Sequence, residues 1–380
     1  NASNFKKEHG DLAPDLVGVT ELTSPYFFVP PSGTTAERPE DCEPGTLRFN
    51  TDIGTLEIFR GKTIGWESIV RGDGQYLGGD SANSVITTST NSNRGTGHRA
   101  IFGGSNSPYP IEYVTISTFG NSQDFGDLNQ NVYWNAGSAS RTRGLINGGY
   151  NAVDTIQFVT IASIGNAADF GNLSAGRHQL GALSSQTRSI VVGGGNSDVM
   201  DYVTIAQTGN AVDFGNLSGN CVYPFTAAST TRGIIAGGGT PSVKNVIDFV
   251  TITTTGDATD FGDLPVARFE MGCQCTSATR AVFGGGKVAP DNSTVNTMEF
   301  ITMATTGNAI DFGDLTRATY QVPSGVVSSP TRGLCIAGYP SPSLVIDAFE
   351  IATTGNSVDF GDCTTSANSG YAFSSGHGGL

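Results

Sequence analysis

Six aspartates stand in a repeated Asp-Phe-Gly tripeptide, the sequence feature with the clearest link to chemistry. In phosphoryl-transfer enzymes the Asp of such a tripeptide holds Mg²⁺, together with a glycine-rich phosphate loop, a lysine and a catalytic-loop aspartate. No such partners accompany the tripeptide here, so we expect these residues to be structural. They are Asp124, Asp169, Asp213, Asp260, Asp311 and Asp359.

Other metal-binding patterns are weak. Asn308, Asp311 and Asp314 are spaced by three, but Ca²⁺ needs about six to eight oxygens around one point and a strand alternates its side chains between two faces. Cys273 and Cys275 form a Cys-x-Cys without further paired Cys or His, which is a poor zinc pattern. We therefore expect no metal and no other cofactor, and we expect the cysteines to be free thiols.

Catalytic constellations are also missing from the sequence. A copper oxidase needs a set of metal ligands and a glycosidase needs paired carboxylates, whereas Glu270 and Glu299 are isolated. No Cys or Glu constellation is matched to the histidines, so the sequence predicts a protein that is not an enzyme. The histidines are His9, His98, His178 and His377.

Charge and hydropathy argue against two kinds of partner. The net charge is −14, from 34 acidic and 20 basic residues, and such a surface repels nucleic-acid phosphates and anionic membranes. No apolar run reaches the roughly 18 residues of a membrane span. Residues 1–10 are polar, without the apolar core of a secretory signal. We expect neither nucleic-acid binding nor membrane insertion.

Internal repetition predicts the fold. The segment Tyr113–Leu128 returns five more times, and its Asp-Phe-Gly recurs at intervals of 44–51 residues. The later copies begin at Phe158, Tyr202, Phe249, Phe300 and Phe349. Each copy is preceded by an apolar segment that begins with Arg and ends in glycine, at Arg99, Arg143, Arg188, Arg232, Arg280 and Arg332.

Each repeat is predicted to contain four antiparallel strands. A weak strand comes first, followed by the Arg-led strand, the Tyr/Phe-Val-Thr-Ile strand, a tight Gly-Asn or Gly-Asp turn, and the Asp-Phe-Gly strand. Four strands in about 47 residues is propeller-blade spacing, and stacked blades bury the faces that one blade leaves open. We predict an all-β chain with a propeller of about six blades over residues 76–380. An open β-solenoid is the alternative.

Closure of the propeller has two candidates. Ser84–Ser89 and Gly370–Ser375 both fit the first strand of the repeat that contains Arg99. If the C-terminal segment takes this position, the first and last segments share one blade. A seventh, degenerate blade from Tyr76 to Asn93 is a further alternative.

A charged residue recurs at two places in every repeat. An Arg stands at the head of the glycine-ended strand and an Asp stands before Phe-Gly. Because the Arg guanidinium donates several hydrogen bonds at once, we expect Arg–Asp or Arg–carbonyl contacts to tie strands or blades together. The structural residues proposed in this way are Arg143, Arg188, Arg232, Arg280, Asp169, Asp213, Asp260 and Asp311.

Recognition is expected where the repeats differ, because loops on a rigid scaffold commonly carry binding residues. The loop between the glycine doublet and the next aromatic strand is longest in the fifth repeat, at residues 286–299. Its candidate binding residues are Lys287, Asp291, Asn292 and Asn296.

The first 75 residues lack the repeat. Gly45–Gly61 reads as two alternating strands around Thr51–Gly54, and Trp66–Ile69 offers a third strand. A small isolated meander is marginally stable. We therefore expect residues 1–75 to be an attachment and oligomerisation module with an extended arm, which leans on the propeller or on copies of itself.

Two resemblances bear on function. Pro31–Pro39, Gly45–Glu57 and Trp66–Ile69 together are similar to a module of bacteriophage tail-fibre and other virion proteins. The repeat Thr-Ile-Ala-Thr-Thr-Gly-Asn-Ala-x-Asp-Phe-Gly-Asp-Leu resembles one in structural proteins of marine phages, including phages of cyanobacteria. The glycine doublets resemble those of kelch repeats, although the later tryptophan of kelch units is missing and the chain has only Trp66 and Trp134.

These resemblances imply a virion structural protein that is made in the host cytoplasm and is associated with the tail. They imply an N-terminal module that forms a homotrimer and docks to other tail proteins, and a propeller that presents loops to a host glycan, a host receptor or a neighbouring tail protein. A capsid decoration or collar protein is the first alternative. A polysaccharide-degrading enzyme is the second.

Overall fold

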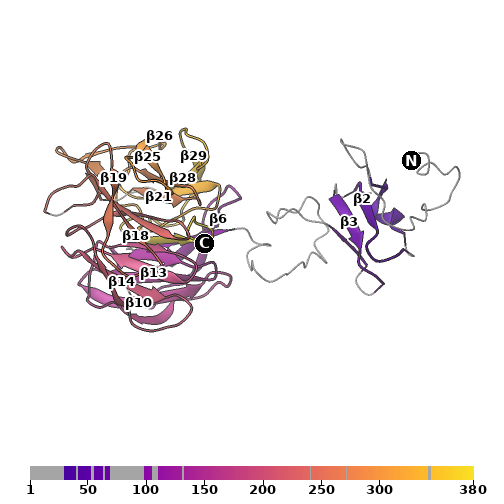
Figure 1. The fold of residues 1–380 in the computed structure, drawn as a ribbon, viewed down its shortest axis with the longest axis horizontal. Coiled ribbons are helices and arrows are strands. Elements are labelled where there is room, and N and C mark those ends of the chain that lie inside the picture. The colour runs from indigo at the N-terminus through magenta and orange to yellow at the C-terminus, as the bar shows by residue number, and fades with distance from the viewer. Residues whose placement is uncertain are drawn as a thin grey trace. The chain divides into compact units, whose positions relative to one another are not determined.

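The computed structural model describes residues 30–39, 42–52, 55–62, 65–68, 98–104, 110–130, 132–239, 241–270, 272–340 and 344–380. In these residues the chain is all-β, with short strands in several small sheets and one 3-10 turn, which confirms the predicted class (Figure 1). The chain divides into two compact units, Asn1–Thr88 and Ser89–Leu380. The predicted boundary at residues 75/76 lies outside the described residues.

The N-terminal unit contains one four-stranded sheet in the order β1-β2-β3-β4. The strands are β1 (Ser32–Gly33), β2 (Leu47–Asn50), β3 (Thr55–Phe59) and β4 (Trp66–Ser68), and the 3-10 turn η2 spans Thr35–Glu37. The meander expected from the sequence is present, and a short parallel β1 adds to it. Buried Glu57 accepts hydrogen bonds from Arg38 at 2.5 Å and from Asn50 at 3.0 Å.

In the larger unit most repeats form one four-stranded antiparallel sheet (Figure 1). Short β20 (Arg268–Phe269), β23 (Lys287–Val288) and β24 (Ser293–Thr294) make an additional sheet. The first repeat contains β5 (Arg99–Gly103), β6 (Pro110–Thr115) and β7 (Gln123–Asp127), and the second contains β8 (Ala136–Ala139), β9 (Arg143–Gly149), β10 (Val153–Thr160) and β11 (Ala168–Asn172). The third contains β12 (Gly181–Ser184), β13 (Arg188–Val192), β14 (Val199–Thr204) and β15 (Val212–Asn216), and the fourth contains β16 (Phe225–Ala228), β17 (Arg232–Ala236), β18 (Val246–Thr251) and β19 (Thr259–Asp263). The fifth contains β21 (Cys273–Thr276), β22 (Arg280–Gly284), β25 (Thr297–Thr302) and β26 (Ile310–Asp314), and the sixth contains β27 (Arg332–Ile336), β28 (Val345–Glu350) and β29 (Val358–Asp362).

The first repeat takes its first strand from the other end of the chain. Strand β30 (Tyr371–Ser374) pairs antiparallel with β5, with Phe373 opposite Ile101, and the sheet order is β30-β5-β6-β7. The C-terminal candidate for this position is therefore the one that occupies it. The other candidate, Ser84–Ser89, lies outside the described residues.

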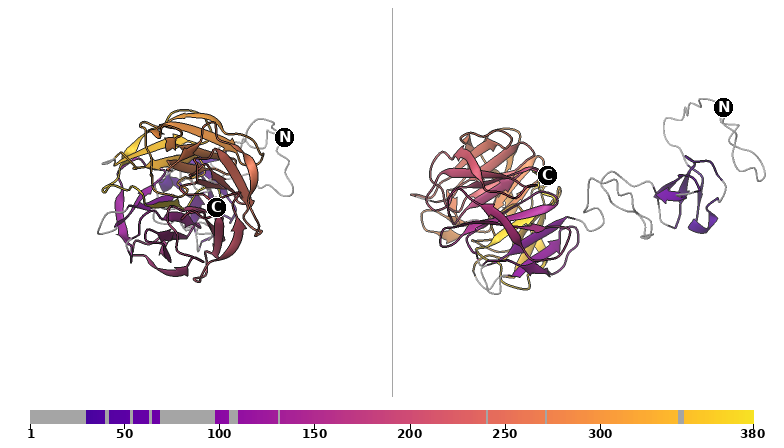
Figure 2. Two further views of the ribbon diagram at one scale, coloured as in Figure 1. Left: turned by 90° about the vertical axis from the view of Figure 1, so that its left-hand side faces the viewer. Right: turned by 90° about the horizontal axis from the view of Figure 1, so that it is seen from below.

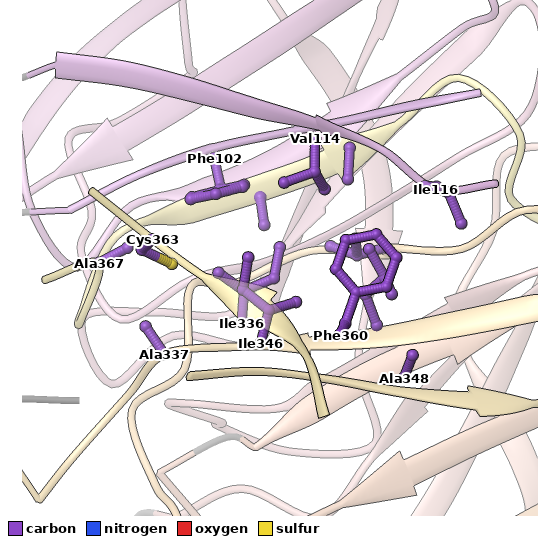
Figure 3. Close-up of a cluster of buried hydrophobic side chains, with 14 residues drawn as sticks. Phe102, Val114, Ile116, Ile336, Ala337, Ile346, Ala348, Phe360, Cys363 and Ala367 are labelled. Atoms are coloured by element: carbon purple, nitrogen blue, oxygen red, sulfur yellow. The ribbon is translucent and has the colours of Figure 1, made fainter. Parts of the chain in front are cut away.

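Hydrophobic clusters lie between consecutive repeats, and one of them joins the sixth repeat to the first. That cluster combines Phe102, Val114 and Ile116 with Ile336 and Phe360 (Figure 3). Five further clusters join repeats one to two, two to three, and so on to six. In the left view of Figure 2 the colours accordingly run round this unit, and the yellow strands of the last repeat lie beside the purple strands of the first.

The Asp-Phe-Gly tripeptide has a different task for each residue. Its Phe side chain is only 0–3% exposed in all six repeats and fills the clusters, whereas its Asp is exposed. Its Gly has φ between 140° and 152° and faces the glycine of the next repeat's Gly-Asn or Gly-Asp pair so closely that a Cβ would collide with that glycine's carbonyl oxygen. Glycine is therefore required here for both its backbone conformation and its lack of a side chain.

The Gly-Asn and Gly-Asp pairs are not the tight hairpin turns expected from the sequence. The turn comes earlier, as at Thr160–Ser163, and the pair runs beside the outer strand of the preceding repeat. There the glycine N–H donates to the carbonyl of the preceding Asp-Phe-Gly Phe at 2.7–3.0 Å. The Asn or Asp side chain accepts a backbone N–H at 2.9–3.1 Å.

The register of the sixth repeat also differs from the expectation. Leu334 lies opposite Ala348, just as Ile101 lies opposite Tyr113 in the first repeat. Ala348 therefore occupies the position that Tyr113 has in the first repeat, which we call the aromatic position. Phe349, which was expected to begin this copy, occupies the next position and is 5% exposed. The predicted copy therefore began one residue too late, because Phe349 is the aromatic residue nearest to the expected position.

We predict that Gly171→Ala lowers the free energy of unfolding by at least about 2 kcal/mol, because Gly171 has φ 148° and a Cβ would meet the Gly209 carbonyl. Gly165→Ala is the matched control, since its Cβ would enter open space. Denaturant unfolding of both variants measures the difference. Equal stabilities would contradict the close-approach argument.

Candidate functional site

The repeat arginines link each repeat to the next. Each guanidinium donates to a backbone carbonyl of the following repeat at 2.8–3.2 Å, and Arg332 of the sixth repeat donates to Ile116 of the first. In five repeats the guanidinium also lies 4.3–4.7 Å from the centre of an aromatic ring of its own sheet. Ala348 removes this ring in the sixth repeat, and Arg332 lies over Phe119 of the first repeat instead.

The structure places the proposed Arg and Asp residues apart. Arg143, Arg188, Arg232 and Arg280 are half-buried and take the carbonyl partners described above. The aspartates are on the outer strands and exposed to solvent, and the structure shows no ion pair between them and these arginines. They are Asp169, Asp213, Asp260 and Asp311.

A second repeated polar position was missed by the sequence analysis. The residue immediately before the aromatic position is buried in every repeat and points its side chain to the neighbouring repeat. For example, Asp201 accepts from Ser174 Oγ at 2.8 Å, and Asp248 accepts from Ser218 Oγ at 2.6 Å. The signal was an acid or amide repeated at one place: Glu112, Gln157, Asp201, Asp248, Glu299 and Asp347.

The fifth repeat lacks one of these donors. The residue equivalent to Ser174 and Ser218 is Pro265, which offers neither a hydroxyl nor an N–H. Burial raises the pKa of Glu299 there. Arg268 forms a buried ion pair with Glu299 and donates to the Gly285 carbonyl at 2.9 Å. The equivalent Arg177 forms the same kind of ion pair with Asp201, where the Ser174 donor is also present.

The most unusual backbone lies just before the first strand position of each repeat. One non-glycine residue per repeat has φ between 47° and 62°, a conformation that bulky side chains rarely adopt. The intervals between these residues equal those between the Asp-Phe-Gly aspartates. They are Trp134, Gln179, Tyr223, Glu270, Gln321 and Ser369, and we call them the left-handed set.

Backbone hydrogen bonds connect the left-handed set. Gln179 N–H donates to the Trp134 carbonyl at 2.7 Å, and Trp134 N–H donates to the Ser369 carbonyl at 2.6 Å. Tyr223 N–H likewise donates to Gln179, Gln321 to Glu270, and Ser369 to Gln321, each at 2.9 Å. Six side chains from six repeats are thereby gathered at one place.

Side chains of the left-handed set surround a small hollow. Trp134, Gln179, Tyr223, Gln321 and Ser369 line it, and its remaining lining residues are Asn135, Val322, Ser324 and Gly370. Gln179 Nε2 donates to the Tyr223 hydroxyl at 2.7 Å, and Ser369 Oγ donates to Gln321 Oε1 at 3.0 Å. Burial, and next the negative charge of Glu270, raise the pKa of Tyr223, so its hydroxyl stays protonated.

The long loop of the fifth repeat reaches this region through Lys287. Its ammonium group forms an ion pair with Glu270 at 2.7 Å and lies 4.0 Å from the centre of the Tyr320 ring, next to Gln321. Asp291 caps the loop by accepting from Ser293 N and Oγ at 3.2 and 3.0 Å. Asn292 is exposed and has φ 58°. Asn296 is half-buried and donates to the Leu315 carbonyl.

The C-terminal residues lie at the opposite ends of the first strands. Trp134 precedes β8, whereas His377 Nε2 lies 3.2 Å from the Ala139 carbonyl at the end of β8 and 3.3 Å from Ser184 Oγ of β12. Gly378 N–H donates to Thr276 Oγ1 of β21 at 2.9 Å. The segment therefore bridges three repeats.

His377 is held in its neutral form. Its Nδ1 accepts the Gly379 N–H at 3.2 Å, so Nε2 carries the proton and donates to Ala139. Burial lowers the pKa of His377 to about 4, although the bond to Ala139 opposes this shift. Protonation would place a second hydrogen on Nδ1 against the Gly379 N–H.

Within the described part of the chain, no three His, Cys, Asp or Glu side chains gather as metal ligands would. The cysteines described there are free thiols. No helix in the same part is long and apolar enough to cross a membrane. No protein-family model and no curated protein matches the chain.

We predict that stability falls as the pH is lowered from about 6.5 to 4, partly through His377. Its pKa is lower in the folded protein than in the unfolded chain, so the unfolded chain binds the additional proton in this range. The loss attributable to this group is about 3 kcal/mol. Unfolding of the wild type and of His377→Gln across this range measures it, and parallel curves for the two proteins would contradict the assignment.

Proposed function

We propose that residues 89–380 form a six-bladed β-propeller. The support is the cyclic order of the contacts between repeats. The arginine–carbonyl bonds, the bonds of the Gly-Asn and Gly-Asp glycines and the hydrophobic clusters each run from one repeat to the next and return from the sixth to the first. In this arrangement β8, β12, β16 and their equivalents are the inner strands, and the left-handed set surrounds one mouth of the central channel.

We propose further that the protein is a tail-associated bacteriophage virion protein whose propeller recognises a surface. The left-handed set carries this proposal. Each non-glycine residue at such a φ costs of the order of 1 kcal/mol or more relative to glycine, yet all six positions hold side chains, and these gather at one mouth. Strain that is kept at one place in a fold is a mark of function. The assignment to a virion rests on the sequence resemblance.

Electron microscopy of phage particles tests the location. Gold-labelled antibody against residues 89–380 should mark the tail of intact particles, and mass spectrometry of purified particles should detect the chain. Label on the capsid or collar would assign the protein to decoration or to the collar. Absence from purified particles would overturn the virion proposal.

The N-terminal unit provides a second test. Its sheet has little core of its own, so we propose that it is stabilised by association in a trimer. Deletion of residues 1–75 should convert a trimer into a monomer, measured by light scattering after size exclusion. An unchanged oligomeric state, with the remaining chain still folded by circular dichroism, would remove the support for this role.

A further inference from the structure

We propose that the channel mouth binds a neutral saccharide on the side formed by the second repeat. A sugar ring would lie against the aromatic cluster and one hydroxyl group would enter the hollow. The aromatic cluster consists of Tyr133, Trp134, Tyr150, His178 and Tyr223. This inference rests on the proposed recognition function and names the class of ligand.

Trp134 is the centre of the aromatic cluster. Its ring lies 5.4 Å from the rings of Tyr133 and Tyr150, 5.8 Å from His178 and 6.3 Å from Tyr223. Tyr133 and Tyr150 stack at 4.5 Å, and Tyr150 is 39% exposed. Pyranose rings present a face of C–H groups that packs on such exposed aromatic rings, while their hydroxyl groups need donors and acceptors beside them.

Asn135 supplies an acceptor that the protein itself does not use. It lines the hollow and is 1% exposed, and its Oδ1 has no hydrogen-bond partner among the described residues. Buried polar atoms are normally paired. The other repeats have Leu180, Pro224, Met271, Val322 and Gly370 at the equivalent position, so the amide is particular to the repeat that carries the aromatic cluster.

The size of the hollow fits one hydroxyl group. It accommodates about one water-sized group, which excludes a whole sugar ring from its interior. A hydroxyl that enters it can donate to Asn135 Oδ1, while the ring that bears it remains outside against Trp134 and Tyr150. Gln179 and Gln321 place further amide groups around the same space.

Charge at the mouth favours a neutral ligand. Lys287 and Glu270 neutralise each other in their ion pair, so the charge of this lysine is already balanced before a sulfate or carboxylate arrives. The chain as a whole carries a net charge of −14, which repels polyanions. A neutral saccharide meets neither obstacle.

Tryptophan fluorescence allows a direct titration, because Trp66 and Trp134 are the two tryptophans of the chain. In full-length Trp66→Phe, the remaining emission comes from Trp134. The protein is first screened on an array of neutral and anionic oligosaccharides, and then titrated with the best neutral hexasaccharide and with a heparin hexasaccharide. We expect the neutral sugar to change the Trp134 emission with saturation and heparin to leave it unchanged.

Variants assign the binding to the mouth. Tyr150→Ser and Gln321→Ala, each in the Trp66→Phe background, should weaken the affinity by at least about tenfold while the unfolding midpoint stays within a few degrees. Ile310→Ser is the matched control, since this side chain is 58% exposed on β26, and its affinity should equal that of the parent. Tyr150→Phe should retain most of the affinity, because it keeps the ring.

Two results would overturn the inference: no neutral saccharide on the array binds, or one binds equally well to the parent and to both mouth variants. Adsorption of the purified protein to host cells separates this failure from failure of the recognition proposal. Adsorption that survives periodate oxidation of cell-surface glycans but is lost after protease treatment would leave recognition standing and replace the saccharide by a protein receptor.

Discussion

The joint between neighbouring repeats is the interaction on which the larger unit depends. At each joint an arginine donates to a carbonyl of the next repeat, a glycine N–H donates to the carbonyl of the buried Phe, and the Asn or Asp that follows this glycine accepts a backbone N–H of the preceding outer strand. A single sheet of four short strands cannot bury both of its faces. The stability of each repeat is therefore shared with its two neighbours.

Two of the joints lose one of their elements. Ala348 removes the ring beneath Arg332, and Phe119 of the adjoining repeat covers the guanidinium. Pro265 removes the hydroxyl donor to Glu299, and Glu299 keeps its ion pair with Arg268, as Asp201 does with Arg177. In the second repeat, buried Asn135 Oδ1 has no hydrogen-bond partner among the described residues, and Asn135 lines the hollow together with Trp134 and Tyr223. This combination of an unpartnered acceptor with aromatic rings is the physical reason for the saccharide proposal.

Much of the fold follows from the sequence because the repeat is local and regular. Alternation of apolar residues and the recurring Arg-led and Asp-Phe-Gly segments predicted the all-β class and the strand positions. The partner of each Arg did not follow, because a carbonyl oxygen leaves no trace in the side-chain sequence. Nor did the role of the Asp-Phe-Gly glycine, which permits the close approach of the next repeat beside the Phe that fills the clusters between repeats.

The candidate functional site was less predictable than the fold. Loop length drew attention to Lys287, which reaches Glu270, but Asp291 caps its own loop and Asn296 bonds to the Leu315 carbonyl. No single residue type is common to all six members of the left-handed set, so no motif marks it in the sequence. Its only regularity is position, which becomes visible once φ is known.

Arg332→Met and Arg188→Met, compared by denaturant unfolding, test the central claim that the repeats are joined in a closed cycle. Both the carbonyl and the ring that contact Arg332 belong to the first repeat. In a closed cycle each variant should lose about 1–2 kcal/mol of unfolding free energy with an unchanged denaturant dependence. A loss for Arg188→Met together with wild-type stability for Arg332→Met would show that the sixth and first repeats are not joined.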